Sequence, residues 1–220
     1  MNTLFPIFLK LKNQLCTVVG GGQIAARKIS GLLECQTTVR VIASAALPVL
    51  HQLSREQKIE LHERAYQPGD IQDSLLVVAA TNDDRLNNQI AQECAQQRIL
   101  CNVVDTPDLC DFYYGSVYTC GELKIAISTN GAAPAFGKKI KAELAERYPE
   151  TLRPYLRYLQ KMREIAKEKI ASTAQRQQIL ETIVQDAEFF AQAQRPEFQD
   201  AVDALDYTKE LDAWLAKEES

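Results

Sequence analysis

The sequence lacks the features that mark several common classes of protein. No apolar run in its 220 residues approaches the roughly 18 residues of a membrane span, and residues 1–10 show neither a basic region nor a small-residue cleavage site. Motifs of the forms H-E-x-x-H, C-x-x-C and G-x-S-x-G are also absent, which disfavours a bound metal and nucleophilic hydrolysis. We therefore expect a cytoplasmic protein with no membrane segment and no metal site.

Histidine is scarce and cysteine is dispersed. The two histidines, His51 and His62, have no metal-ligand spacing, so we interpret them as packing or surface residues. The six cysteines are far apart, and two fall in predicted strands, which favours free thiols in a reducing compartment over a disulfide framework. A net charge of −4 argues against nucleic-acid binding as the main role.

The first hundred residues alternate between strand and helix patterns. The predicted strands cover residues 14–19, 37–42, 58–63, 75–80 and 100–104, and the predicted helices cover 23–35, 45–55 and 84–97. The strands 14–19 and 75–80 are apolar throughout, which is typical of strands with both faces covered. This order predicts an α/β fold with a doubly wound parallel sheet, in which the stretch 64–74 is too short for a full crossover helix.

The turn after the first strand carries an informative glycine pattern. Gly20, Gly22 and Ala25 fit the form G-x-G-x-x-G/A, which brings a pyrophosphate against the backbone at the start of a helix. The alternative is a glycine-rich turn in another kind of α/β protein. The second strand ends at Ser44 without the acid that usually holds a ribose, so these residues do not choose between NAD and NADP.

After the fifth strand the pattern changes. Residues 112–119 and 122–128 predict an antiparallel hairpin with Cys120 and Gly121 between its strands. Further helices are predicted at 134–148, along an apolar stripe from 152 to 170, and at 173–193, 196–205 and 207–217. Residues 138–176 hold eleven basic and five acidic residues, either as solvated helix faces or as a wall facing an anionic ligand.

Two segments carry side chains suited to chemistry. Asp105 stands at the carboxyl end of a strand, where it could accept a proton while a hydride leaves a substrate; a turn-forming or capping aspartate is the alternative. Ser128, Thr129 and Asn130 precede a helix start and Lys138 follows it. They could form an anion site, or an ordinary helix cap with surface lysines.

Five motifs in order resemble a known family. They are Phe-Pro-Ile-Phe-Leu (5–9), Val-Val-Gly-Gly-Gly-Gln-Ile-Ala-Ala-Arg-Lys (18–28), Ala-Ala-Thr-Asn-Asp (79–83), Cys-Asn-Val-Val-Asp-Thr-Pro (101–107) and Ile-Ala-Ile-Ser-Thr-Asn-Gly-Ala-Ala-Pro (125–134). Together they resemble the precorrin-2 dehydrogenase/sirohydrochlorin ferrochelatase family, whose members complete sirohaem synthesis. The resemblance covers about residues 3–150.

The resemblance implies a domain order, a cofactor and two reactions. A Rossmann-like NAD-binding domain would cover 1–111, a hairpin segment for dimerisation and substrate binding 112–149, and a helical domain 150–220. NAD⁺ would take a hydride from the tetrapyrrole precorrin-2, giving sirohydrochlorin. Fe²⁺, a substrate rather than a bound cofactor, would then enter the macrocycle. The implied assembly is a homodimer.

The resemblance also implies roles for single residues. Asp105 matches the family's motif aspartate and would act as a general base. Ser128 and Thr129 match a hydroxyl pair near the tetrapyrrole pocket, to which Asn130 and Lys138 would add substrate contacts. The residues that match nucleotide contacts are Gly20, Gly22, Gln23, Ile24, Ser44 and Ala45.

Three departures from the family pattern leave the second reaction open. Gln23 stands where bifunctional relatives often have Asp, and Asn130 stands where Gly is common. Some relatives have a pocket histidine late in the chain, whereas this sequence has none after His62. The alternatives are therefore a dehydrogenase without metal insertion, or a dinucleotide-sensing module without chemistry.

Overall fold

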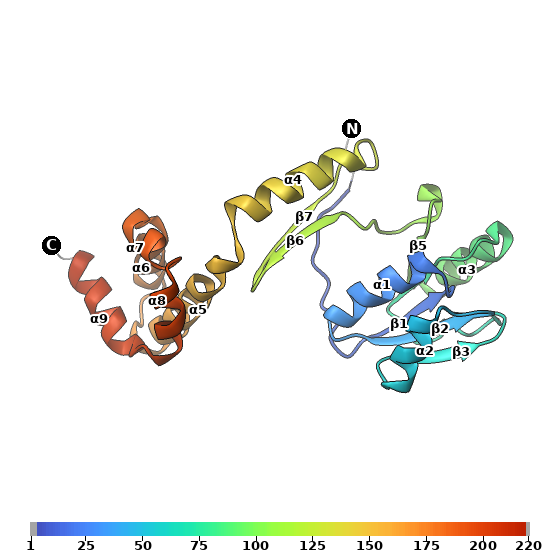
Figure 1. Ribbon diagram of the computed structural model, residues 1–220, viewed down its shortest axis with the longest axis horizontal. Helices are drawn as coiled ribbons and strands as arrows, with labels where there is room; N and C mark the ends of the chain where they lie inside the picture. Colours follow the sequence, from blue (N-terminus) through green and yellow to red (C-terminus); the bar gives the residue numbers. More distant parts are fainter. Residues whose placement is uncertain (1–3, 219–220) are drawn as a thin grey trace. The chain divides into compact units, whose positions relative to one another are not determined.

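The computed structural model describes residues 4–218, and its internal contacts divide the chain into two compact units. The first unit ends at Tyr114 and the second begins at Gly115 (Figure 1). The finer division into domains at 111 and 149 stays a prediction. Within residues 4–218, no helix combines the length and apolarity that crossing a membrane would require.

The first unit is built on a five-stranded sheet in which every pairing is parallel. Its strands are β1 (Leu15–Val19), β2 (Thr38–Ala43), β3 (Glu60–Glu63), β4 (Leu76–Ala79) and β5 (Leu100–Val103). The strand order β3-β2-β1-β4-β5 places β1 in the centre. Successive strands β2 and β3 add on one side of β1, whereas β4 and β5 add on the other, so the order of the sheet reverses there. The predicted doubly wound sheet is confirmed, and ligands of such sheets bind beyond the carboxyl ends of the strands at this reversal.

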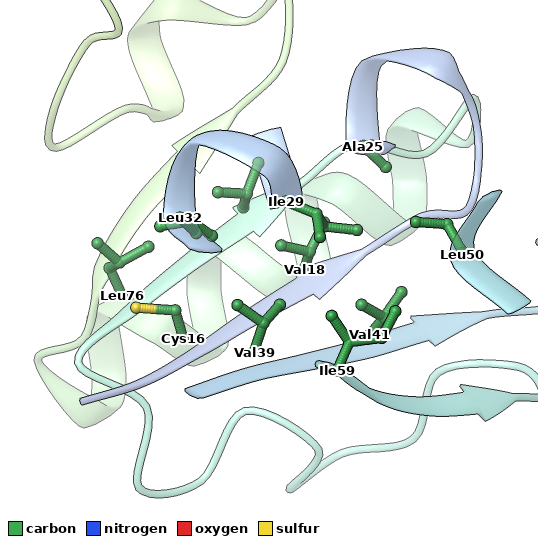
Figure 2. Packing of buried hydrophobic residues seen from close by; sticks show 11 residues of the cluster. Cys16, Val18, Ala25, Ile29, Leu32, Val39, Val41, Leu50, Ile59 and Leu76 are labelled. Atoms are coloured by element: carbon green, nitrogen blue, oxygen red, sulfur yellow. The ribbon is translucent and has the colours of Figure 1, made fainter. Parts of the chain in front are cut away.

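Helices cover both faces of the sheet. They are α1 (Gln23–Glu34), α2 (Pro48–Arg55) and α3 (Asp84–Gln97). Figure 2 shows Ala25, Ile29 and Leu32 of α1 packed on alternate residues of the strands. The strand residues between these, on the opposite face of the sheet, pack with Ile90 and Cys94 of α3. Because both faces are buried, the central strands are apolar at nearly every position.

Every predicted element of this unit is present within three residues of its expected ends, and α2 shows the largest difference. The sequence pattern predicts a helix from residue 45, whereas α2 begins at Pro48. The preceding residues form a turn instead, in which the Leu47 N–H donates to the carbonyl oxygen of Gly21 at 3.0 Å. Residues 64–74 contain no helix, as expected, and an Arg64–Asp70 ion pair holds this connection.

The second unit begins with a two-stranded antiparallel hairpin, β6 (Ser116–Cys120) and β7 (Leu123–Ile127). Gly121 turns the chain between them with a φ of +54°. The predicted first strand, 112–119, is wrong at its start, because residues 112–115 lie outside the strand. Asp111 and Phe112 instead exchange hydrogen bonds with β5 of the first unit's sheet.

Helices make up the rest of the second unit. They are α4 (Pro134–Arg147), α5 (Arg153–Lys169), α6 (Thr173–Gln185), α7 (Ala187–Gln192), α8 (Pro196–Ala201) and α9 (Tyr207–Glu218). The single helix predicted at 173–193 is wrong, since Asp186 ends α6 and caps α7 by accepting from the Phe189 N–H at 2.7 Å. The helix predicted at 196–205 is also too long, because α8 ends at Ala201 and a 3-10 turn follows.

Tyr158 lies at the centre of the helical core. Its hydroxyl donates to Glu210 at 2.9 Å and accepts from the Trp214 ring N–H at 2.9 Å. Phe189 packs on the Tyr158 ring with centroids 4.9 Å apart. Burial raises the pKa of Tyr158 well above its ordinary range, so this phenol stays neutral and satisfied within the core.

We expect the core under α1 to dominate the stability of the first unit. Ile29 is fully buried, so Ile29→Ala should lower the free energy of unfolding by about 2–5 kcal/mol. Val49 on α2 is 47% exposed, and Val49→Ala should change the same quantity by at most about 0.5 kcal/mol. Urea unfolding followed by circular dichroism measures both; equal losses would contradict this assignment of the core.

Candidate functional site

The turn between β1 and α1 depends on a close contact with β4. Gly20 has a φ of +130°, and its N–H donates to the carbonyl oxygen of Ile42 at 2.8 Å. A Cβ on Gly20 would overlap the backbone carbonyl of Ala80. Only glycine therefore lets the end of β1 lie against the end of β4 with this backbone conformation.

Gly21 makes a second close contact, with the chain that follows β2. A Cβ there would overlap the carbonyl oxygen of Ala45 and would lie 2.9 Å from the Cβ of Ala43. This contact brings Ser44 and Ala45, both exposed, beside the glycine turn. The sequence pattern gave Gly21 no role, because the fingerprint leaves that position free.

Gly22 is open where its neighbours are crowded. A Cβ added to it would meet no heavy atom within 4 Å, and the residue forms the N-cap of α1. The first turn of α1 holds no acidic residue, and its first N–H groups have no partner within the helix. Free space beside an uncapped helix start is the environment that a pyrophosphate needs, so the residues present fit a dinucleotide.

A cavity of about 540 Å³ opens at the carboxyl edge of the sheet. Three junctions supply its walls: the start of α1, the connection from β4 to α3, and the chain after β5. Its lining residues are Ile24, Ala80, Thr81, Asn82, Asp84, Asn87, Asn88, Val104, Asp105 and Thr106. Ile24 and Asp105, which belong to separate sequence motifs, thus line the same cavity.

The β4–α3 junction contributes polar residues that the sequence analysis did not assign to the site. The Thr81 hydroxyl donates to Asn87 Oδ1 at 2.7 Å, and Asn87 Nδ2 donates to the Thr81 carbonyl at 3.1 Å. Asp83 caps α3 by accepting from the N–H groups of Arg85 and Leu86. The sequence feature that could have identified Thr81 is its position, because it directly follows an apolar strand in the Ala-Ala-Thr-Asn-Asp motif.

Asp105 is exposed and has an unusual backbone conformation. Its φ is +60°, which is uncommon for a residue other than glycine. The following 3-10 helix (Pro107–Leu109) has Thr106 as its N-cap, so capping does not explain Asp105. An exposed carboxylate at the rim of a polar cavity, held in a costly conformation, is suited to a functional role.

The loop after Asp105 is fixed to β5 by the next cysteine. The Cys110 thiol lies 3.1 Å from the Val103 carbonyl and 3.3 Å from that of Thr106, and it accepts from the Val103 N–H at 3.3 Å. Burial raises the pKa of Cys110, so the thiol stays neutral and can donate. All six cysteines are free thiols.

The remaining predicted site residues belong to the second unit. Ser128 Oγ accepts from the Asn130 N–H and Thr129 Oγ1 from the Ala133 N–H, each at 3.2 Å. Both hydroxyls thus shape the turn before α4, and Lys138 is exposed on that helix. Their participation in a substrate site stays a prediction.

Metal-ligating side chains are not gathered into a site in the described part of the chain. Within residues 4–218, no three His, Cys, Asp or Glu side chains are placed to hold an ion. His62 pairs with Glu60 at 2.7 Å, and His51 lies 3.8 Å from Glu63, all on the first unit.

The first unit is a dinucleotide-binding domain of the Rossmann type. Its strand order, the glycine turn after β1 and the open start of α1 together define this class. Residues 7–116 match the family described as "Putative NAD(P)-binding", and residues 121–147 match "Sirohaem biosynthesis protein central". The chain belongs to the precorrin-2 dehydrogenase/sirohydrochlorin ferrochelatase family that its motifs resemble.

Similar proteins extend beyond this chain in length. It is 36% identical to a siroheme synthase of Ruthia magnifica subsp. Calyptogena magnifica over 80% of this chain and 37% of that protein. It is 34% identical to the siroheme synthase of Pseudoalteromonas atlantica, over 82% of this chain and 39% of that protein. The chain thus spans about two fifths of the length of these relatives.

A solved structure matches the whole architecture. "SirC, precorrin-2 dehydrogenase" superposes with a TM-score of 0.73 at 25% identity, covering 92% of this chain and 100% of that one. The Rossmann-like sheet, the hairpin and the helical region predicted from the sequence are therefore a shared fold.

The two glycines of the fingerprint should respond differently to alanine. Gly20→Ala should cost about 1–3 kcal/mol of unfolding free energy, because the added methyl group meets Ala80 at a positive φ. Gly22→Ala should leave stability unchanged but weaken NAD⁺ binding roughly tenfold, since its methyl group takes the space of the pyrophosphate. Calorimetric titration measures the NAD⁺ affinity and urea unfolding measures the stability. If Gly22→Ala binds NAD⁺ as tightly as the unaltered protein, the pyrophosphate does not bind beside Gly22.

Proposed function

We propose that the protein catalyses the NAD⁺-dependent oxidation of precorrin-2 to sirohydrochlorin, a step of sirohaem synthesis. The observation that carries the proposal is the cavity shared by Ile24 at the start of α1 and Asp105 after β5. It joins the open start of α1, where the pyrophosphate would bind, to a carboxylate at the carboxyl edge of the sheet. Support also comes from the precorrin-2 dehydrogenase whose entire length this chain covers.

The cofactor would be held by groups that come mainly from the backbone. The N–H groups at the start of α1 would receive the pyrophosphate beside Gly22, and Ser44 and Ala45 would contact the adenosine half. Residues 44–47 contain no lysine or arginine to pair with a 2′-phosphate, which favours NAD over NADP. When bound, NAD⁺ supplies the hydride acceptor.

Asp105 would supply the base. Oxidation of precorrin-2 removes two electrons and one proton as a hydride, and a second proton must leave as the new double bond forms. The carboxylate of Asp105 would take that proton and pass it to water, for which its exposed position is suited. The amides of Asn82 and Asn88, on the same cavity wall, would help to orient the reacting ring.

Asp105→Asn should reduce kcat for precorrin-2 oxidation by roughly 10²–10⁴-fold, because the amide cannot accept the proton. NAD⁺ affinity should stay within about twofold, since the pyrophosphate site does not involve this residue. Asp108→Asn, an exposed aspartate of the same loop, is the matched control and should leave kcat unchanged. Anaerobic assays of NADH formation measure both. Retained turnover in Asp105→Asn would show that Asp105 is not the base, and no turnover in the unaltered protein would favour the sensing module.

Insertion of Fe²⁺ into sirohydrochlorin is a second activity that we propose on the family resemblance. The ion would be a substrate, and the macrocycle would lose its two pyrrole protons to a base, for which Asp105 is the candidate. Gln23, Asn130 and the absence of a histidine after His62 depart from the bifunctional pattern. Oxidation without metal insertion is therefore the alternative.

An anaerobic assay decides between these two forms of the proposal. Sirohydrochlorin mixed with Fe²⁺ or Co²⁺ should change its absorption spectrum faster when the protein is added, and Asp105→Asn should slow this change. A rate equal to that of the protein-free mixture would leave oxidation as the sole reaction.

The substrate would be recognised by its many carboxylates. Ser128, Thr129, Asn130 and Lys138 would contact the tetrapyrrole, and the basic residues of 138–176 would attract it. Each exposed lysine contributes little alone, so several would have to act together. A homodimer and a cytoplasmic location belong to the same proposal.

A further inference from the structure

The chain after Asp105 returns to the sheet as a short segment, residues 110–114, that is fastened to β5. Asp111 donates its N–H to the Cys101 carbonyl at 2.8 Å and accepts from the Cys101 N–H with its carboxylate at 2.8 Å. Asn102 Nδ2 donates to the Phe112 carbonyl at 2.9 Å. These bonds hold the end of the loop that carries Asp105 against β5, the strand from which the loop begins.

The far end of the 110–114 segment is fastened to α1. Phe112 packs against the core beneath that helix, and its ring lies 5.5 Å from the ring of Tyr114. The Lys28 ammonium stands 3.3 Å above the centroid of the Tyr114 ring, which is close enough for a strong cation–π contact. Lys28 is four residues after Ile24, so both lie on the same face of α1, and Ile24 borders the cavity with Asp105.

We propose that Lys28 is a positioning residue for Asp105. Through Tyr114 it pins the 110–114 segment to α1, and it keeps a positive charge beside the loop whose carboxylate accepts the proton. The inference rests on the proposed function, in which Asp105 is the base. Lys28 itself does not line the cavity that Asp105 borders.

The charges around Lys28 give this arrangement a dependence on pH. Burial, aided by the charge of Arg27, lowers the pKa of Lys28 to about 8, while Cys110 and Asp105 act in the opposite direction. Burial raises the pKa values of Cys110 and Tyr114, so neither is charged near pH 8. Among the groups that act on Lys28, Asp105 therefore supplies the negative charge.

The sign of the effect follows from the lowered pKa. Below about pH 8 Lys28 is an ammonium, and both its contact with Tyr114 and its electrostatic attraction to Asp105 are present. As the pH rises through 8 the proton leaves, and a neutral amine provides neither. Turnover should therefore fall above pH 8 in the unaltered protein.

The kinetic test compares variants across pH 6.5–9.5. Lys28→Met should lower kcat roughly tenfold at pH 7, and the gap should close towards pH 9.5, where the unaltered Lys28 is neutral as well. Lys28→Arg keeps the cation and should remove the alkaline decline. Arg27→Met, the neighbouring exposed cation, is the matched control and should move the decline slightly upward in pH.

A lysine that served only to hold the fold would give a different result. Lys28→Met would then lower kcat by the same factor at every pH, and that outcome would overturn the proposal. NAD⁺ affinity, measured by calorimetry, should stay within about twofold in all variants, which shows that the nucleotide site remains folded.

A second measurement does not depend on activity. In protein labelled with ¹³C at lysine Cε, one NMR signal should titrate near pH 8 and should be missing from Lys28→Met. Asp105→Asn should lower that midpoint, because the carboxylate charge raises the pKa of Lys28, whereas Asp108→Asn should not. A midpoint near 10, or one unaffected by Asp105→Asn, would refute the coupling.

The two proposals can fail separately. If Asp105→Asn retains full turnover, Asp105 is not the base, yet the NMR midpoint still reports whether Lys28 and Asp105 interact. If the midpoint does not respond while Asp105→Asn loses turnover, the base is correct and Lys28 has no part in positioning it.

Discussion

The close approach of three backbone segments at the centre of the sheet is the constraint on which the site depends. Gly20 lies against Ala80 and Gly21 lies against Ala45, at distances where any side chain would overlap backbone. This crowding brings the ends of β1, β2 and β4 together and leaves Gly22 open at the start of α1. The open helix start that we propose for the pyrophosphate is a consequence of how closely the chain packs there.

The candidate base is held differently from the candidate cofactor site. Backbone geometry at the glycine turn is rigid, whereas Asp105 stands on an exposed loop with a left-handed conformation. Its loop is closed by the adjacent residues Cys110 and Asp111, whose thiol and carboxylate both bond to the backbone of β5. A carboxylate on an exposed loop that is bonded back to a strand can exchange a proton without losing its place, which is a common arrangement for groups that react.

Patterns along the sequence predicted most of the first unit, because burial on both faces leaves a strong signal. Apolar runs marked β1 and β4, and the helix predicted at 84–97 matches α3, whose start is capped by Asp83. The errors occurred where a distant contact overrides local preference. Residues 112–115 have strand composition but are bound by Phe112 to Asn102, and Asp186 interrupts a helical pattern because its carboxylate satisfies the next helix start.

The sequence alone determined the fold class and the glycine turn after β1, and it singled out Asp105 as a candidate, because each is encoded in a few adjacent residues. Tertiary structure alone decided that Gly21 must lack a side chain, that Thr81 and Asn87 form part of the cavity wall, and that Lys28 meets Tyr114. The contacts of Gly21 and Lys28, and the cavity wall as a whole, join positions far apart in the chain. Such contacts depend on how strands and helices pack in space, and local sequence carries no record of that packing.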